Sequence, residues 1–206
     1  MFVVTADQRR STRHGDRVDG LLASLEPWTI AWSDQVTLAP ERTVGDEVQA
    51  VLDGAEATVD LALTLMRASD WSVGVGVGPV NLPLKSTARA SSGAAFVNAR
   101  RAVERARGRG EPVPLVVAGD NPATEEAATA LLQLLASVVR RRSDAGWEVY
   151  DLLQPGVTQR DVAARLGIST QAVSQRIASG MLDEERRARP VAVDLLRSAD
   201  EGDGRS

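Results

Sequence analysis

The residues from Thr158 to Ile177 have the types and the spacing that reading a DNA groove requires. The second half of this segment predicts a short helix whose outward positions carry small, neutral hydrogen-bonding side chains: Thr170, Gln171, Ser174 and Gln175. Such side chains can bond the donors and acceptors on base edges in the major groove. Other polar and basic residues of the segment are candidates for phosphate contacts or for fixing the register: Thr158, Gln159, Arg160, Arg165, Ser169 and Arg176. We therefore expect a helix-turn-helix that binds double-stranded DNA.

Two helices joined by a tight turn would hold these side chains. Thr158 can cap the first helix and Ser169 the second, while Gly167 can take the positive φ that ends the first helix. Ala163 is small enough for the second helix to cross close to it. The shared apolar face would come from residues at helical spacing: Val162, Leu166, Ile168, Val173 and Ile177. The alternatives are a generic helical hairpin with solvated polar faces, or an adaptor module that binds another protein.

A single module of this kind neutralises few phosphates, so useful affinity predicts a homodimer on two half-sites about one helical turn apart. Residues 124–142 predict a strong helix with one apolar face: Ala127, Leu131, Leu134, Leu135 and Val138. This helix is the candidate dimer contact, unless it packs on its own sheet. Arg140, Arg141 and Arg142 would either be a solvated helix end or contact phosphates.

Acidic residues at two strand ends suggest a different chemistry. Asp7 ends the first expected strand, and Gly45-Asp46 lies at a turn between two others, followed by Glu47. If those strands are neighbours, Asp7 and Asp46 lie at one sheet end and could share a Mg²⁺ ion, as in two-metal phosphoryl chemistry. The alternative is an ordinary turn, because Gly and Asp are common turn residues.

A loop rich in serine and basic residues precedes another expected helix. Lys85, Arg89 and Ser91-Ser92 lead into a helix that begins near Gly93, where a phosphate or a nucleotide-like ligand could bind. The alternative is a solvated loop. The alternating glycines of residues 74–78 are followed by Pro79, so they are no dinucleotide fingerprint, and they favour the close approach of a helix or a ligand.

The elements expected along the chain give an α+β protein. Strands are expected at 2–5, 28–38, 42–44, 48–52, 71–80 and 113–118, and helices at 16–25, 55–66, 93–107, 124–142, 146–153, 159–166 and 170–178. This order predicts an antiparallel or mixed sheet with helices on one face, a ferredoxin-like plan. The expected units are an α/β domain at 1–121, a connecting helix at 122–143, the helix-turn-helix domain at 144–198 and a flexible tail at 199–206.

Composition excludes several classes of function. The 206 residues contain no cysteine and one histidine, which excludes thiol chemistry and makes triads and multi-histidine metal sites implausible. The longest apolar run, near 131–139, is too short to span a bilayer, and the N-terminus predicts a strand instead of a signal peptide, so we expect a cytoplasmic protein. Residues 140–198 hold ten arginines and eight acidic residues, whereas the whole chain has a net charge of −4. This charge distribution is compatible with a small DNA-reading module attached to an acidic body.

Three blocks of the sequence resemble the SatD-type bacterial proteins. The blocks are residues 40–50, 73–78 and 92–100, which are similar to a Gly-Asp-Glu turn, a glycine-rich strand and a helix start in that family. Many of those proteins carry a C-terminal helix-turn-helix. More distantly, Asp7 with the following residues and the Gly45-Asp46 turn resemble the two metal-binding aspartate blocks of class III nucleotide cyclases. The resemblance implies a cyclase-like fold for residues 1–120.

The sequence departs from the cyclase pattern where catalysis would need it. Arg10-Ser11 stand where cyclases have Gly-Phe, Val48 stands where the SatD-type turn has an aromatic residue, and Ala102 stands where an arginine should follow Asn98. That arginine would neutralise charge in the transition state. We therefore expect a degenerate cyclase-like domain that needs no cofactor, mediates dimerisation or senses a nucleotide-like effector, and is not an enzyme. The alternative is a Mg²⁺-dependent nucleotide-processing enzyme that uses Asp7 and Asp46.

Overall fold

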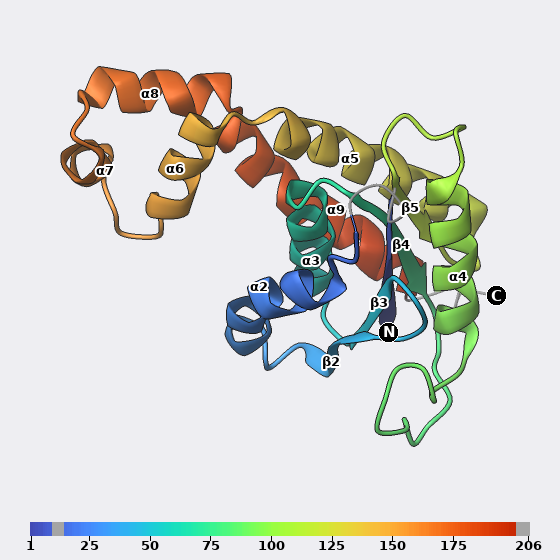
Figure 1. Ribbon diagram of the computed structural model, residues 1–206. Helices are drawn as coiled ribbons and strands as arrows, with labels where there is room; N and C mark the ends of the chain where they lie inside the picture. Colours follow the sequence, from blue (N-terminus) through green and yellow to red (C-terminus); the bar gives the residue numbers. More distant parts are fainter. Residues whose placement is uncertain (10–14, 201–206) are drawn as a thin grey trace.

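The computed structural model describes residues 1–9 and 15–200 and shows an α+β protein built on one mixed sheet (Figure 1). Five strands and eight helices lie in the described part of the chain. The strands are β1 (Phe2–Gln8), β2 (Val36–Arg42), β3 (Glu47–Leu52), β4 (Trp71–Val77) and β5 (Leu115–Ala118). Their order is β2-β3-β1-β4-β5, and every neighbouring pair is antiparallel except β4 and β5, which are parallel. The expected α+β class is confirmed.

Four helices share the main hydrophobic core on one face of the sheet. They are α2 (Val18–Ala31), α3 (Ala55–Arg67), α5 (Pro122–Arg141) and α9 (Leu182–Asp200). Alternate residues of β1 point into this core, because successive side chains of a strand face opposite ways: Phe2, Val4 and Ala6. Helix α9 was not among the expected elements, and its apolar positions Ala192, Val193, Leu196 and Ala199 are all buried. Residues 199 and 200 thus belong to a helix, and the rest of the expected tail lies outside the described residues.

The opposite face of the sheet is covered by α4 (Ala94–Arg107), so the expectation of helices on one face only is wrong. Gly74 and Gly76 of β4 make this contact close. A Cβ atom at Gly76 would lie 2.1 Å from the backbone oxygen of Ala95 and 2.1 Å from the backbone nitrogen of Ala99. The alternating glycines therefore admit the backbone of α4, which was one of the two explanations that the sequence offered.

The region around Trp28 is helical and not a strand. Trp28, Ile30 and Trp32 alternate as in a strand, but Leu21, Leu25, Trp28 and Trp32 also follow helical spacing. The helical pattern prevails because it buries Leu21 and Leu25 in the core and lets the Trp28 indole N–H donate to Asp60 of α3 at 2.8 Å. Strand β2 begins only at Val36 and ends at Arg42, so most of the strand expected at 42–44 is part of the turn before β3.

Three short helices form a small lobe beyond the sheet: α6 (Asp144–Leu152), α7 (Gln159–Leu166) and α8 (Thr170–Ser179). Figure 1 shows this lobe projecting from the body, with α5 leading into it and α9 returning from it. It has its own apolar cluster, formed by Val149, Val162, Ala163, Val173, Ile177 and Leu182. Among the described residues, none of the helices has both the length and the apolar character that a membrane crossing needs.

Candidate nucleic-acid interface

Helix α7 starts at a reciprocal cap. The Thr158 hydroxyl oxygen accepts from the Asp161 backbone N–H at 3.2 Å, and the Asp161 carboxylate accepts from the Thr158 backbone N–H at 2.9 Å. These two hydrogen bonds satisfy backbone donors that a helix end otherwise leaves unpaired. Hydrogen bonds from Thr158 also lower the pKa of Asp161. The cap places Gln159 and Arg160 in the first turn of α7, where both are exposed.

The turn between α7 and α8 has the conformation that its sequence predicts. Gly167 has φ 64°, a left-handed value that suits glycine, and the Ile168 N–H donates to the Ala163 carbonyl at 3.1 Å. The Ser169 hydroxyl then accepts from the Ala172 N–H at 3.1 Å and caps α8. Helix α8 therefore begins at Thr170, as expected, and its direction follows from local hydrogen bonds.

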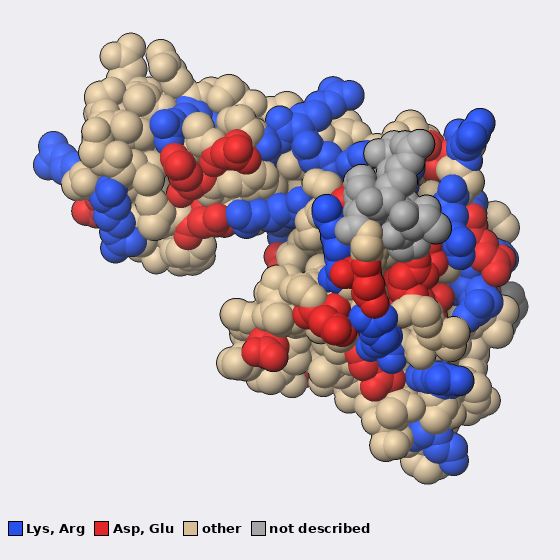
Figure 2. Space-filling model, in the orientation of Figure 1, with Lys and Arg blue, Asp and Glu red and all other residues tan. Residues whose placement is uncertain are grey.

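Helix α8 separates its apolar and polar residues cleanly. Val173 and Ile177 are buried in the cluster of the lobe. The expected base-reading residues Gln171, Ser174 and Gln175 are all exposed on the other side, as is Thr170, which is expected to fix the register. The Ser174 hydroxyl donates to the Gln159 side-chain oxygen at 2.7 Å, which ties the exposed surfaces of α7 and α8 together. Figure 2 shows the outer part of this lobe as largely uncharged, with separate basic side chains near its edge and acidic side chains on the part nearer the body.

The three arginines expected at phosphates differ in their surroundings. Arg176 is half-buried, forms an ion pair with Glu148 of α6 at 2.8 Å and donates to the Ala145 carbonyl at 3.4 Å. It therefore holds α6 against α8. Arg160 and Arg165 are exposed, and neither forms an ion pair with a described carboxylate.

A buried ion pair at the base of the lobe was not foreseen. Arg142 and Glu185 pair with both side chains fully buried, so Arg142 is neither a solvated helix end nor a phosphate contact. The Arg142 guanidinium also donates to the Gly180 carbonyl at 3.0 Å, just after α8, and lies 4.4 Å from the centroid of the Trp147 ring. It thereby connects the end of α5, the end of α8 and helix α9. No local pattern indicated this pair, because its members are 43 residues apart.

The acidic residues of the sheet come together as expected, but a cation already lies beside them. Asp7 is opposite Glu47 in the pairing of β1 and β3, and the Gln8 N–H donates to the Asp46 carbonyl at 3.1 Å. The Arg107 guanidinium of α4 lies 3.2 Å from the Asp7 carboxylate. Burial raises the pKa of Asp7, Arg107 opposes this rise, and the charges of Asp46 and Glu47 add to it. Within residues 1–9 and 15–200, no cluster of three potential metal ligands is found.

In the expected anion cradle before α4, some backbone and side-chain groups are already hydrogen-bonded within the chain. The N–H of Ala95, in the first turn of α4, donates to the Pro79 carbonyl at 3.2 Å, and Gly93 forms a β-bridge with Val80. Lys85 and Arg89 are exposed in the preceding loop. The Lys85 N–H donates to the Ser91 hydroxyl at 3.1 Å, so the loop is closed by its own hydrogen bonds.

Comparisons with known proteins identify no relative: neither the family models, nor the curated proteins, nor the solved structures include a match to this chain. The Arg10-Ser11 departure from the cyclase pattern lies outside the described residues.

Proposed function

We propose that this protein is a DNA-binding transcriptional regulator that reads a major groove with α8. The observation that carries the proposal is the exposure of Thr170, Gln171, Ser174 and Gln175 on one side of a capped helix at the far end of the molecule. Thr158, Gln159, Arg160 and Ser169 lie at the starts of α7 and α8, where backbone N–H groups and side chains can contact phosphates. The amide and hydroxyl groups of the exposed α8 side chains would form hydrogen bonds with base edges.

The body of the protein would be a degenerate cyclase-like domain with a ferredoxin-like plan. The strand order β2-β3-β1-β4, with all neighbours antiparallel, supports that plan, to which β5 adds a parallel edge. The ion pair between Asp7 and Arg107 supports a structural role for the acidic sheet end, since the guanidinium already supplies a positive charge 3.2 Å from the carboxylate. We therefore propose that the domain is not an enzyme.

We also propose that two copies act together through α5. Its buried face consists of Ala128, Leu132, Leu135, Ala136 and Val139, so Leu135 belongs to the body and is unavailable to a partner. The rest of the apolar face expected from the sequence stays at least partly open: Ala127, Leu131, Leu134 and Val138. Leu134 is 63% exposed, which supports a contact between copies along this side of the helix.

The experiment that tests the proposal starts by recovering DNA bound to the full chain across the genome and deriving a shared site. Fluorescence anisotropy with that site and with a shuffled duplex should then show a preference of about 10³-fold or more. Affinity should fall steeply with salt, because phosphate binding releases counterions. Binding to DNA without sequence preference, or salt-insensitive association with a protein and none with DNA, would contradict the proposal and favour the adaptor.

A further inference from the structure

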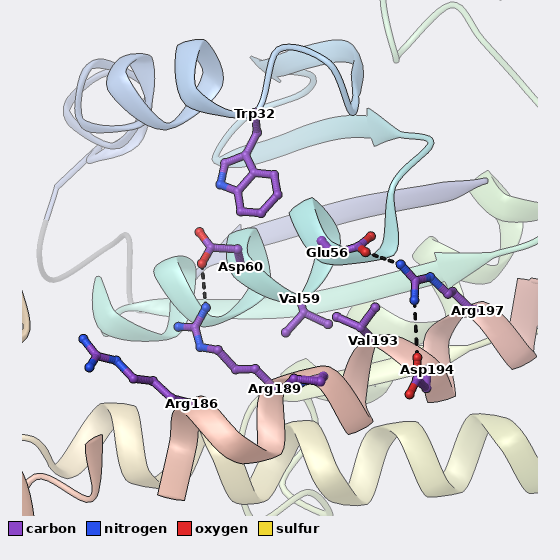
Figure 3. Close-up of a pocket in the computed structure, with 10 residues that line it drawn as sticks. Trp32, Glu56, Val59, Asp60, Arg186, Arg189, Val193, Asp194 and Arg197 are labelled. Carbon is purple, nitrogen blue, oxygen red and sulfur yellow. Dashed lines mark hydrogen bonds and ion pairs between the residues drawn. The ribbon is translucent and has the colours of Figure 1, made fainter. Parts of the chain in front are cut away.

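A cavity of about 360 Å³ lies between α3 and α9, below the end of α2 (Figure 3). Its apolar wall is formed by Trp32, Val59, Pro190 and Val193. Figure 3 shows the Trp32 indole hanging over the opening from one side, with the arginines of α9 on the other. A mostly apolar hollow of this size with a few polar groups is the usual form of a small-molecule site.

The charged groups of the cavity are paired, with one exception. Arg189 pairs with Asp60 at 2.6 Å and with Glu185 at 2.8 Å. Arg197 pairs with Glu56 and, at 3.3 Å, with Asp194.

Arg186 also lines the cavity, is exposed, and has no described carboxylate within ion-pairing distance. Its guanidinium donates one hydrogen bond at 2.6 Å, to the Leu153 carbonyl at the end of α6. Figure 3 shows the Arg186 side chain beyond the Arg189–Asp60 pair and pointing away from Trp32, so the one uncommitted positive charge lies at the rim of the cavity.

This arrangement selects the chemistry of a ligand. A guanidinium can bind a carboxylate through two parallel hydrogen bonds, and an indole favours a flat ring beside it. A second negative charge would meet the carboxylates of Glu56, Asp60 and Asp194 without a free cation to balance it. We propose that the cavity binds an aromatic monocarboxylate, with the carboxylate on Arg186 at the rim and the ring extending along the apolar wall toward Trp32.

The same arginine connects the cavity to the lobe. Leu153 follows α6, which packs against α8, so a carboxylate that draws the Arg186 guanidinium away from the Leu153 carbonyl alters a contact between α9 and the lobe. The ligand would therefore act as an effector of DNA binding. This last step rests on the proposed function, whereas the binding of the ligand does not.

The test is isothermal titration of the full chain with 2-naphthoate as the probe, and with neutral 2-naphthamide and dianionic 2-naphthyl phosphate for comparison. One molecule of naphthoate should bind per chain, and both analogues should bind about 10-fold or more weakly. Arg186→Met should weaken naphthoate binding by about 10-fold or more. Arg187→Met, on the same helix but outside the cavity, should leave it unchanged.

Trp32→Leu gives a second readout, since it should weaken naphthoate and naphthamide alike by removing the shared ring contact. Failure of naphthoate to bind the wild-type chain, or binding unaffected by Arg186→Met, would overturn the site. With the genomic DNA site in hand, naphthoate should shift the DNA affinity of the wild-type chain and not that of Arg186→Met. An unchanged affinity would overturn the effector role, whereas failure of the ligand-free chain to bind DNA would contradict the proposed function instead.

Discussion

Replacing Glu185 by glutamine should destabilise the whole protein strongly, because it removes the charge from one member of a fully buried ion pair. Glu185 is the partner of both Arg142 and Arg189. Without its charge, Arg142 would keep only neutral partners: the amide oxygen of the new glutamine, the Gly180 carbonyl and the faces of two aromatic rings, at 4.4 Å from the centroid of Trp147 and 4.7 Å from that of Tyr150. These contacts cannot neutralise a guanidinium that is shielded from water.

The expected cost is about 3–5 kcal/mol, which is typical of breaking a buried ion pair from one side. Domains of this kind are stable by about 5–15 kcal/mol, so the variant loses a large share of its stability. At about 2–4 °C per kcal/mol for a chain of this length, the melting temperature should fall by about 6–20 °C. Urea unfolding followed by circular dichroism and tryptophan fluorescence measures the change.

Two further variants show whether burial is the cause. Asp16→Asn removes the charge from an exposed pair, because Asp16 and Arg42 pair at the surface with side chains 57% and 32% exposed, and it should cost far less stability than Glu185→Gln. The double variant Arg142→Met with Glu185→Met should lose less stability than Glu185→Gln, since no buried charge remains at position 142 or 185. A loss below about 1 kcal/mol for Glu185→Gln would refute the reasoning.

Three other predictions follow from single contacts. Gly76→Ala should lower the free energy of unfolding by about 1–3 kcal/mol or more, because its Cβ would meet the backbone of α4. Gly20→Ala, with open space around it in α2, should raise the free energy of unfolding by about 0.5–1 kcal/mol. Urea unfolding measures both changes, and equal changes for the two variants would contradict the prediction. Burial raises the pKa of Asp7, so ionising it costs folding free energy, and Asp7→Asn should stabilise the protein at neutral pH. Melting curves should show this gain vanish as pH falls below 3.8, the usual pKa of an aspartate; a loss of stability at neutral pH would contradict the prediction and show that the pair with Arg107 outweighs the cost of burial. Arg160→Ala should weaken binding to all duplexes alike and reduce the salt slope by about one, while Arg176→Ala should mainly lower stability by breaking the pair with Glu148; equal effects of both on the salt slope would refute the distinction.

The lobe was the most predictable part of the chain because its boundaries depend on local chemistry. Thr158, Gly167 and Ser169 each act on residues within five positions, through caps and a left-handed turn, and the structure places all three as expected. The turn at Gly45-Asp46 was predictable for the same reason, although the strand before it ends at Arg42 and not at residue 44. The exposed face of α8 could be predicted because Val173 and Ile177 are its apolar positions, so the remaining residues had to face away from the core.

The missed features depend on contacts between distant residues. The first half of α9 is rich in acidic residues and arginine, which is typical of a solvated segment, yet Glu185 is buried because Arg142 meets it from the end of α5. Helix α4 crosses the second sheet face only because Gly74 and Gly76 leave room for its backbone. Hydrophobic periodicity and helix caps are local signals, and they do not specify which distant segment packs against a given residue.

The central claim is that Gln171 contacts a base edge in a DNA groove, and the ratio of specific to non-specific affinity tests it most directly. For Gln171→Ala, affinity for the genomic site should fall by about 5- to 100-fold, with little change for a shuffled duplex. Gln154→Ala, an exposed glutamine between α6 and α7, should change neither affinity. Equal losses on both duplexes for Gln171→Ala, or no loss on either, would contradict the claim.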